Sequence, residues 1–282
     1  MKNMLIVDGQ VHIWATSTPE RPWPARHAPH RPVPLGAEDC LKEMAAAGVD
    51  RAVLVPPSWE GERNDLVIDA ARRYPDKFAV MGRFDTEAPN VNEAKEQIAT
   101  WKQQPGMLGM RFTFRRPQLA APLVEGRIDW LWEAAEKHQI RLMILVTHSQ
   151  VKYIDRIAER HPGLKIIIDH LGLVSGDKDE AGWANLDLLL AIAKRPNVAV
   201  KASGTASYTS DTYPYRWLHP YLRRVYDAFG PKRMFWGTDF TRLPCTYRQA
   251  VTQFTEEMPW LKGDDLESVM GKGICEWLGW RI

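Results

Sequence analysis

The sequence predicts an α/β protein of one domain, a (β/α)8 or TIM barrel spanning residues 1–282, and three observations support this fold. Short apolar, β-rich runs alternate with longer segments that each carry one apolar stripe. The alternation repeats eight times, and parallel strands joined by right-handed helical crossovers close into a barrel. Finally, histidine or aspartate follows four runs that are scattered over the whole chain. Only a closed barrel brings such strand ends together.

The predicted strands are short and apolar, and they comprise residues 4–8, 51–55, 78–83, 107–112, 141–147, 165–169, 198–202 and 233–238. The helices expected between them comprise residues 38–47, 63–74, 91–102, 129–138, 151–160, 185–194 and 217–229. Many of these helices end at a turn signal, such as Gly48 or Pro162. An open doubly wound sheet is the alternative fold, but no GxGxxG or Walker sequence follows any strand.

Composition restricts the class of protein and of partner. With 45% hydrophobic and 26% charged residues, the chain has the composition of a globular protein with a large core. A formal net charge of +2 disfavours nucleic acid as a partner, so we expect a small-molecule substrate. The three cysteines lack metal-finger or CxxC spacing. Nowhere do about 18 uncharged apolar residues follow one another, and no export signal is evident. We expect a cytoplasmic protein without a membrane span, either as a homo-oligomer, with a companion subunit, or alone.

One segment, residues 18–34, is unusual because it carries six prolines and follows the first strand. A proline-stiffened loop at this place is either a lid over the barrel mouth or an ordered surface loop or subunit contact. Five histidines lie outside strand ends, and we interpret them as surface or packing residues: His27, His30, His138, His161 and His219.

Chemistry in a barrel belongs at the carboxyl ends of the strands. The polar residues found there, with Gln10, are expected to face one shared cavity: His12, Arg111, His148, His170, Lys201 and Asp239. A lone histidine after a strand is more often structural, but three of them together with an aspartate favour a reaction centre.

Five segments carry a resemblance to a known family: VDGQVHIW, GMRFTF, IIIDHLG, NVAVKASG and WGTDF, in this order and spacing. The chain resembles the amidohydrolase superfamily, specifically the amidohydrolase-2 branch of metal-dependent TIM-barrel hydrolases. That branch includes sugar lactonases and 2-pyrone-4,6-dicarboxylate lactonase. Decarboxylases related to aminocarboxymuconate semialdehyde decarboxylase are its cousins. The resemblance covers nearly the whole chain.

The chain departs from this family at two places that bear on metal binding. The family's first strand usually reads Asp-x-His-x-His, and Gln10 stands where the first histidine is expected. A neutral amide oxygen is a poor zinc ligand compared with imidazole. Two-metal members place a bridging lysine on the fourth strand, where this chain has Arg111, which cannot ligate a metal. We therefore expect no two-metal centre.

A single divalent ion, zinc or manganese, remains open, as does a metal-free site. By analogy with the decarboxylase cousins, the resemblance implies His12, His148 and Asp239 as ligands. His170 would then be the acid/base partner or a further ligand. The resemblance to the pyrone lactonase implies that a metal-free site is equally acceptable.

In either case the residues support hydrolysis of an activated carbonyl. Asp239 would take a proton from the attacking water, which requires a desolvated carboxylate whose pKa is raised. His170 could share that proton or pass it to the leaving oxygen. Without a metal, the cations Arg111 and Lys201, with His12, would stabilise the oxyanion.

Substrate contacts are expected from Gln10, Lys201 and Trp14, while Arg111, Arg115 and Arg116 suit a substrate carboxylate. A solvated basic loop is an equally good interpretation of Arg115 and Arg116. Asp8 is expected to be structural.

Three functions follow from these residues. The first is hydrolysis of a small cyclic ester, that is, a lactone either with or without a carboxylate. The second is metal-dependent decarboxylation of an aromatic or unsaturated acid. The third is a catalytically impaired barrel that acts as a partner subunit.

Overall fold

The computed structural model describes residues 4–24 and 29–282. One sheet of eight parallel strands runs through it in the order β1 to β8, so each strand pairs with the next strand in the chain. The strands are β1 (Val7–Val11), β2 (Arg51–Leu54), β3 (Phe78–Gly82), β4 (Met107–Thr113), β5 (Arg141–Leu145), β6 (Ile166–Ile168), β7 (Val198–Ser203) and β8 (Met234–Gly237). This order confirms the predicted barrel and shows that the doubly wound alternative is wrong, because that fold reverses its strand order.

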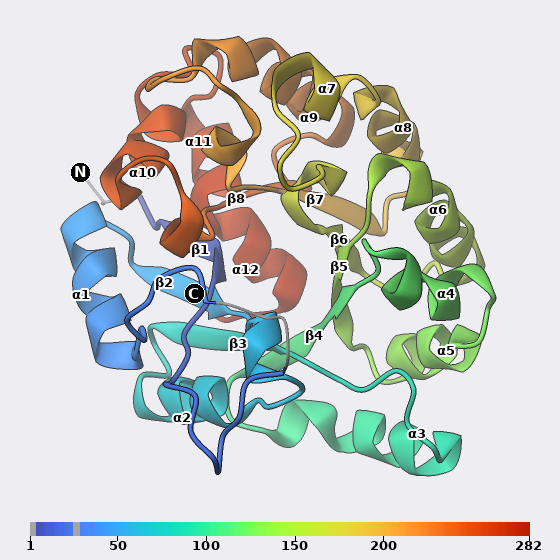
Figure 1. The fold of residues 1–282 in the computed structure, drawn as a ribbon. Helices are drawn as coiled ribbons and strands as arrows, with labels where there is room; N and C mark the ends of the chain where they lie inside the picture. The colour runs from blue at the N-terminus through green and yellow to red at the C-terminus, as the bar shows by residue number, and fades with distance from the viewer. Residues whose placement is uncertain (1–3, 25–28) are drawn as a thin grey trace.

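Helices surround the sheet as a ring, and the C-terminal helix instead lies across one opening of that ring (Figure 1). They are α1 (Ala37–Ala47), α2 (Asp65–Arg73), α3 (Val91–Thr100), α4 (Pro117–Val124), α5 (Asp129–Lys137), α6 (Val151–Arg160), α7 (Asp179–Trp183), α8 (Leu186–Leu190), α9 (His219–Phe229), α10 (Tyr247–Thr255), α11 (Gly263–Glu267) and α12 (Gly273–Leu278). Each of the seven helices predicted from an apolar stripe has a counterpart among them. The helices α4, α7, α10, α11 and α12 were not predicted.

Two boundaries differ from the sequence prediction in ways that matter. Strand β1 begins at Val7 rather than at residue 4, so Gln10 lies inside the strand. The predicted helix 185–194 is α8 followed by a 3-10 turn, Ala191–Lys194. Element ends depend on hydrogen bonds to other segments, which an apolar pattern does not encode.

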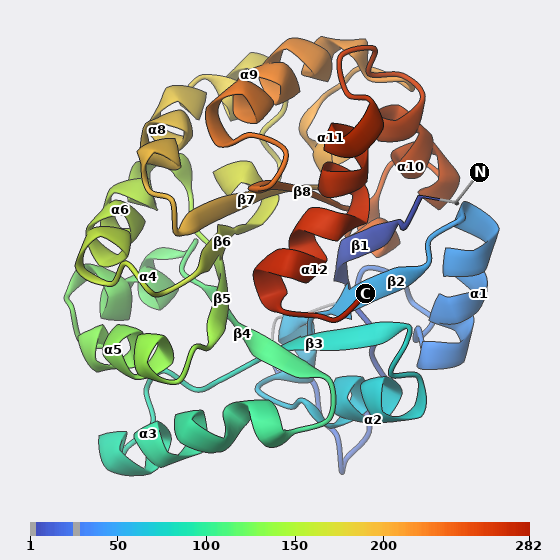
Figure 2. The ribbon, with the colours of Figure 1, turned by 180° about the vertical axis from the view of Figure 1, so that it is seen from behind.

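The strand residues alternate between two cores. One set packs inside the barrel with α12, and it includes Val53, Met143, Ile167 and Phe235. Their neighbours along each strand pack outward against the helices. Helix α12 lies across one opening of the ring, as Figure 2 shows, and its Ile274 belongs to the inner cluster. The amino end of the barrel is thus filled, which leaves the carboxyl end for a site.

The seam between β1 and β8 is closed by a side chain. The Asp8 carboxylate, which is fully buried, accepts hydrogen bonds from the Thr238 backbone N–H at 2.8 Å and from the Tyr247 hydroxyl at 2.7 Å. It also accepts the Thr238 hydroxyl and, at 2.9 Å, the Gln10 N–H. The Asp239 N–H donates to the Gln10 carbonyl at 2.8 Å. Asp8 therefore has the structural role that the sequence predicts.

Glycine lets the two seam strands come close. A Cβ atom on Gly9 would lie 2.9 Å from the Trp236 carbonyl oxygen, and one on Gly237 would lie 3.1 Å from the Gly9 nitrogen. Both contacts are against backbone, which cannot give way as a flexible side chain can. The two glycines allow the seam to be narrow enough for Asp8 to bridge it.

In the part of the chain that the structure describes, every helix is too short or too polar to pass through a lipid bilayer.

The seam is tested by Asp8→Ala, which leaves the buried N–H groups of Thr238 and Gln10 without an acceptor. We expect a loss of at least about 3 kcal/mol in the free energy of unfolding, measured by urea denaturation. Tyr247→Phe removes one donor and leaves the carboxylate, so it should cost about 1 kcal/mol. A loss in Asp8→Ala no larger than that in Tyr247→Phe would contradict the role of Asp8.

Candidate active site

A cavity of about 150 Å³ lies at the carboxyl end of the barrel. The lining includes four residues that the sequence places in the reaction centre: His12, Arg111, His170 and Asp239. The other lining residues are His30, Ser58, Trp59, Thr113, Arg115, Arg116, Leu119, Leu145 and Arg242. Segments that follow β1, β4, β6 and β8 thus meet around one space, as the predicted barrel requires.

Asp239 is the centre of this cavity. It follows β8 in the left-handed backbone conformation, with φ 55°, which costs about 1 kcal/mol for a residue other than glycine. Its Oδ2 forms an ion pair with Arg242 Nε at 2.5 Å. Its Oδ1 lies 3.3 Å from His12 Nε2 and, within residues 4–24 and 29–282, is buried without a hydrogen-bond donor. One oxygen of the carboxylate is thus available to a ligand.

His12 presents an unprotonated nitrogen to Asp239. Its Nδ1 lies 2.6 Å from the Val55 carbonyl oxygen, which can only accept, so the proton is on Nδ1. Burial lowers the pKa of His12 to about 4, although Asp239 opposes the shift, and the imidazole is neutral at pH 7. Its Nε2 is therefore an acceptor.

His170 repeats this arrangement on the other side. It also adopts a positive φ, 50°, directly after β6. Its Nδ1 donates to the Ser203 backbone oxygen at 3.1 Å, and the Ser203 hydroxyl lies 2.8 Å from the same nitrogen. Its Nε2 lies 4.0 Å from Asp239 Oδ2. Burial, with Arg242 nearby, lowers the pKa of His170 to about 3. Two neutral imidazoles and one carboxylate thus direct acceptor atoms at the same region.

The predicted rise in the pKa of Asp239 is wrong. Burial acts in the expected direction and is the largest single effect, but the Arg242 guanidinium together with His12, His170 and His30 outweighs it and holds the pKa of Asp239 well below its usual range. Asp239 is therefore ionised at neutral pH. A carboxylate with a low pKa is a weak base, which restricts the reactions that it can assist.

A second charged group lies beneath the cavity. Asp169 is fully buried and forms ion pairs with Lys201 Nζ at 2.8 Å and with Arg111 Nε at 3.2 Å. Burial opposes ionisation of Asp169, but Lys201 and Arg111 lower its pKa below the ordinary value. Arg111 also donates to the Thr113 hydroxyl at 2.6 Å. Its guanidinium is thus fixed where it lines the cavity.

Four predicted site residues do not reach the cavity in this structure. Gln10 and Lys201 have no exposed surface, and Trp14 is 1% exposed behind Trp59, against which it packs edge-on. The His148 Nε2 lies 2.9 Å from the Leu171 carbonyl oxygen, away from Asp239. Substrate binding by Gln10, Lys201 and Trp14 and metal ligation by His148 stay predictions, and each would need a rearrangement of these contacts.

Two titratable cavity residues next to Asp239 were not found from the sequence. His30 was interpreted as a surface or packing residue, which is wrong, because its Nδ1 lies 3.8 Å from Asp239 Oδ1 and 2.8 Å from the Thr241 hydroxyl. It comes from the proline-rich segment, so that segment reaches the barrel mouth. His27 lies outside the described residues. No sequence pattern marks Arg242 as a site residue. Its side chain faces Asp239 only because the chain turns after Asp239.

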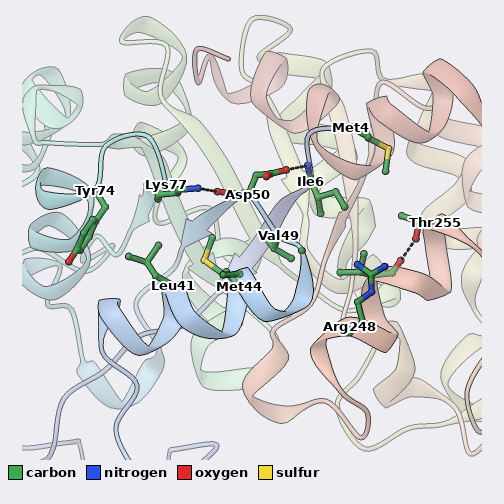
Figure 3. Close-up of a pocket in the computed structure, with 13 residues that line it drawn as sticks. Met4, Ile6, Leu41, Met44, Val49, Asp50, Tyr74, Lys77, Arg248 and Thr255 are labelled. Atoms are coloured by element: carbon green, nitrogen blue, oxygen red, sulfur yellow. Dashed lines mark hydrogen bonds between the residues drawn. The ribbon is translucent and has the colours of Figure 1, made fainter. Parts of the chain in front are cut away.

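A larger cavity, of about 760 Å³, lies outside the barrel between α1 and α10 (Figure 3). Its walls are mostly apolar, with Leu41 and Met44 from α1. Its cations are already engaged: Lys77 donates to the Asp50 carbonyl and Arg248 to the Ala47 carbonyl. It contains none of the residues that surround Asp239, so the smaller cavity is the candidate active site.

Comparison with known proteins agrees with this geometry. The family model for amidohydrolases, Amidohydro_2, matches residues 7–266. The chain belongs to the amidohydrolase family. The family resemblance that the sequence motifs indicate is thereby confirmed, as is the prediction that the protein is a hydrolytic enzyme.

Two relatives of this amidohydrolase and one solved structure are informative. An L-fucono-1,5-lactonase from Burkholderia ambifaria is 27% identical over 240 residues, covering 83% of this chain and 79% of that protein. A 4-sulfomuconolactone hydrolase from Hydrogenophaga intermedia is 26% identical over 211 residues, covering 72% and 64%. An amidohydrolase from Burkholderia multivorans with bound zinc matches with a TM-score of 0.80 at 19% identity, covering 98% and 99%. This last likeness confirms the fold.

The residues present in this amidohydrolase do not fit a resident divalent ion. Among residues 4–24 and 29–282, no three side chains of His, Cys, Asp or Glu are grouped closely enough to hold one. The Arg242 guanidinium already neutralises Asp239, and Arg111 adds a second positive charge to the cavity. A cation placed between them would be repelled by both.

The neutral histidines predict how stability depends on pH. Because the pKa values of His12 and His170 are lowered from 6.5 to about 4 and about 3, the unfolded chain binds two more protons near pH 5. Asp8, whose pKa burial raises to about 6, offsets one of these. The free energy of unfolding should therefore fall by at least about 1.4 kcal/mol per unit as pH drops from 6 to 5, because the lowered pKa values of His30, His148 and His219 act in the same direction.

Urea denaturation at several pH values measures this slope. The variant His170→Asn removes one of the protons that the unfolded chain binds in excess, so the slope between pH 6 and 5 should be smaller than in the wild type by about 1.4 kcal/mol per unit. A wild-type protein that becomes more stable over this interval would contradict neutral, buried imidazoles at both positions.

Proposed function

We propose that this amidohydrolase hydrolyses a lactone that bears a carboxylate, with Asp239 as the base that activates water. One observation carries the proposal. The free oxygen of Asp239 and two acceptor imidazoles surround a space that a hydrogen-bond donor would fill, inside a cavity lined by arginines. The lactone-hydrolysing relatives support the choice of a cyclic ester.

Water fits the acceptor atoms of the site. A water molecule has two hydrogens, which can be donated to Asp239 Oδ1 and to His170 Nε2, because the single lone pair of His12 Nε2 already accepts from Gln10. The lone pairs of the water then face the rest of the cavity. In the reaction the water oxygen bonds to the lactone carbonyl carbon while Asp239 takes one proton. The ring C–O bond then breaks, and Asp239 returns the proton to the leaving oxygen, directly or through His170. The product is the open hydroxy acid or its keto tautomer.

The arginines supply positive charge where negative charge forms and where the substrate carries it. Arg111 is held by Asp169 and Thr113, so its guanidinium is positioned in advance for an oxyanion. Arg115 and Arg116 also line the cavity, and a guanidinium pairs with a carboxylate through two parallel hydrogen bonds. This is the basis for an anionic rather than a neutral lactone.

The low pKa of Asp239 also favours a particular leaving group. A weak base assists best when the acyl group is already activated, because less proton transfer is then needed in the transition state. Lactones with an enol-type leaving oxygen meet this condition, and amides do not. Amide hydrolysis is therefore less well supported.

The two other functions are also less well supported. A metal-dependent decarboxylase needs a resident ion, which the donor groups of this cavity do not fit. An impaired barrel would not need to keep Asp239 ionised between two neutral imidazoles. Association with a second copy or a companion subunit stays a prediction.

The function is tested with Asp239→Asn, a variant that keeps the shape of the side chain and removes the base. Proton release from a panel of lactones with and without carboxylates should be seen with the wild type and fall by about 10³-fold in the variant. Carbon dioxide release from aromatic acids should stay at background, and a chelator should leave hydrolysis unchanged. Activity confined to neutral lactones would contradict the assigned substrate class.

The electrostatic role of Arg242 is tested with Arg242→Gln. Removing the guanidinium raises the pKa of Asp239, so the acid limb of the kcat/KM profile should move to higher pH. Arg115→Gln is the matched control, because Arg115 lines the cavity without pairing with Asp239. It should raise KM for the anionic lactone and leave the limb in place. Equal shifts in both variants would contradict a specific Arg242–Asp239 interaction.

A further inference from the structure

Lys201 and Gln10 form a buried hydrogen-bonded pair whose role the reaction above does not use. The Lys201 Nζ donates to Gln10 Oε1 at 2.6 Å and to the Gly9 carbonyl at 3.1 Å. The Gln10 Nε2 lies 3.3 Å from His12 Nε2. All three side chains come from β7 or from β1 and the residue after it. They form one chain of contacts that ends at the imidazole facing Asp239.

The direction of every hydrogen bond in this chain is fixed. An ammonium group can only donate, so Gln10 must accept through Oε1 and direct its N–H₂ group at His12. The N–H₂ group can only donate, so His12 Nε2 must accept. At the other end, the Val55 carbonyl can only accept, so His12 Nδ1 must donate. Both ends of the chain therefore require the same tautomer of His12.

We propose that Lys201 and Gln10 are a pair of positioning residues. Lys201 orients Gln10, which holds His12 in its Nδ1–H tautomer and so keeps Asp239 Oδ1 free for water. The alternative tautomer carries its proton on Nε2, which lies 3.3 Å from that oxygen. An N–H at this distance would donate to the carboxylate. His12 would then donate to Asp239, and the water would lose the free carboxylate oxygen as its acceptor.

Charge explains why a lysine stands here. Lys201 is paired with the buried Asp169 and has no exposed surface. A buried ion pair contributes little to stability compared with apolar packing, but it fixes the direction of the hydrogen bonds it makes. A neutral hydroxyl in place of the ammonium could either donate or accept, so Gln10 would be free to turn its amide around.

The pair is tested with Gln10→Glu, which keeps the side-chain shape and the bond to Lys201 but has no N–H to donate. The carboxylate would face His12 Nε2 as an acceptor, so His12 must take a proton there. Nitrogen NMR of ¹⁵N-histidine-labelled protein distinguishes the tautomers, and His12→Asn assigns the signal. We expect Nδ1–H in the wild type and a protonated Nε2 in Gln10→Glu.

The kinetic effect rests on the proposed function. The N–H that Gln10→Glu creates on His12 Nε2 is shared between the introduced carboxylate and Asp239 Oδ1. Because that oxygen is then no longer free, kcat for lactone hydrolysis should fall by about 10²-fold with KM changed far less. Gln10→Met is a second variant that introduces no charge. It removes the donor to His12 and should also permit the Nε2–H tautomer, with a fall in kcat in the same direction.

The matched control is Gln253→Glu, another buried glutamine, which lies on α10 and contacts Thr205. It introduces the same charge and should leave the His12 signal and kcat unchanged. The proposal is overturned if wild-type His12 carries its proton on Nε2, or if both Gln10 variants keep the Nδ1–H tautomer. The tautomer is measured without substrate. If the NMR spectra are as expected but the protein hydrolyses no lactone, the proposed function is contradicted and the positioning role of Lys201 and Gln10 is not.

Discussion

The hydrogen bonds to the Asp8 carboxylate are the interactions on which the site depends, because they hold together the first and the last strand of the barrel, β1 and β8. Four donors from β1, from the segment after β8 and from α10 converge on this carboxylate. The neighbouring Gly9 and Gly237 have no side chains that would keep the strands apart. The same seam carries His12 at one edge and Asp239 at the other, so their 3.3 Å contact follows from how the barrel closes.

The charged residues around this seam form two groups that have different roles. Below the cavity, Lys201, Asp169 and Arg111 form a buried network that fixes the orientation of Gln10 and of the Arg111 guanidinium. At the mouth, Arg242 keeps Asp239 ionised. The imidazoles lie between these groups and stay neutral because they are buried. The site therefore obtains its polarity from fixed cations and from histidines held as acceptors.

This electrostatic design links the substrate to the mechanism. A carboxylate that is held ionised by an arginine is a mild base, which suits an ester that already has a good leaving group. The other arginines of the cavity suit an anion. The two features point to the same class of compound, an acidic lactone, although they arise from different residues.

Much of this protein was determined by local sequence. The alternation of apolar strands and striped helices gives the barrel, because each pattern can bury its apolar face only in one arrangement. The positions of His12, His170 and Asp239 directly after strands place them at one end of it. The family motifs indicate the hydrolase class for the same reason, since they are these strand ends.

Only the tertiary structure decided what the residues at those ends do. Nothing in the sequence shows that His148 turns to Leu171, that His30 enters from the proline-rich segment, or that Lys201 and Gln10 lie below the cavity floor. The pKa of Asp239 was predicted in the wrong direction, because Arg242 faces it only once the following turn has formed. A sequence pattern reports which face of an element is buried, whereas charge and proton positions depend on which groups meet in three dimensions.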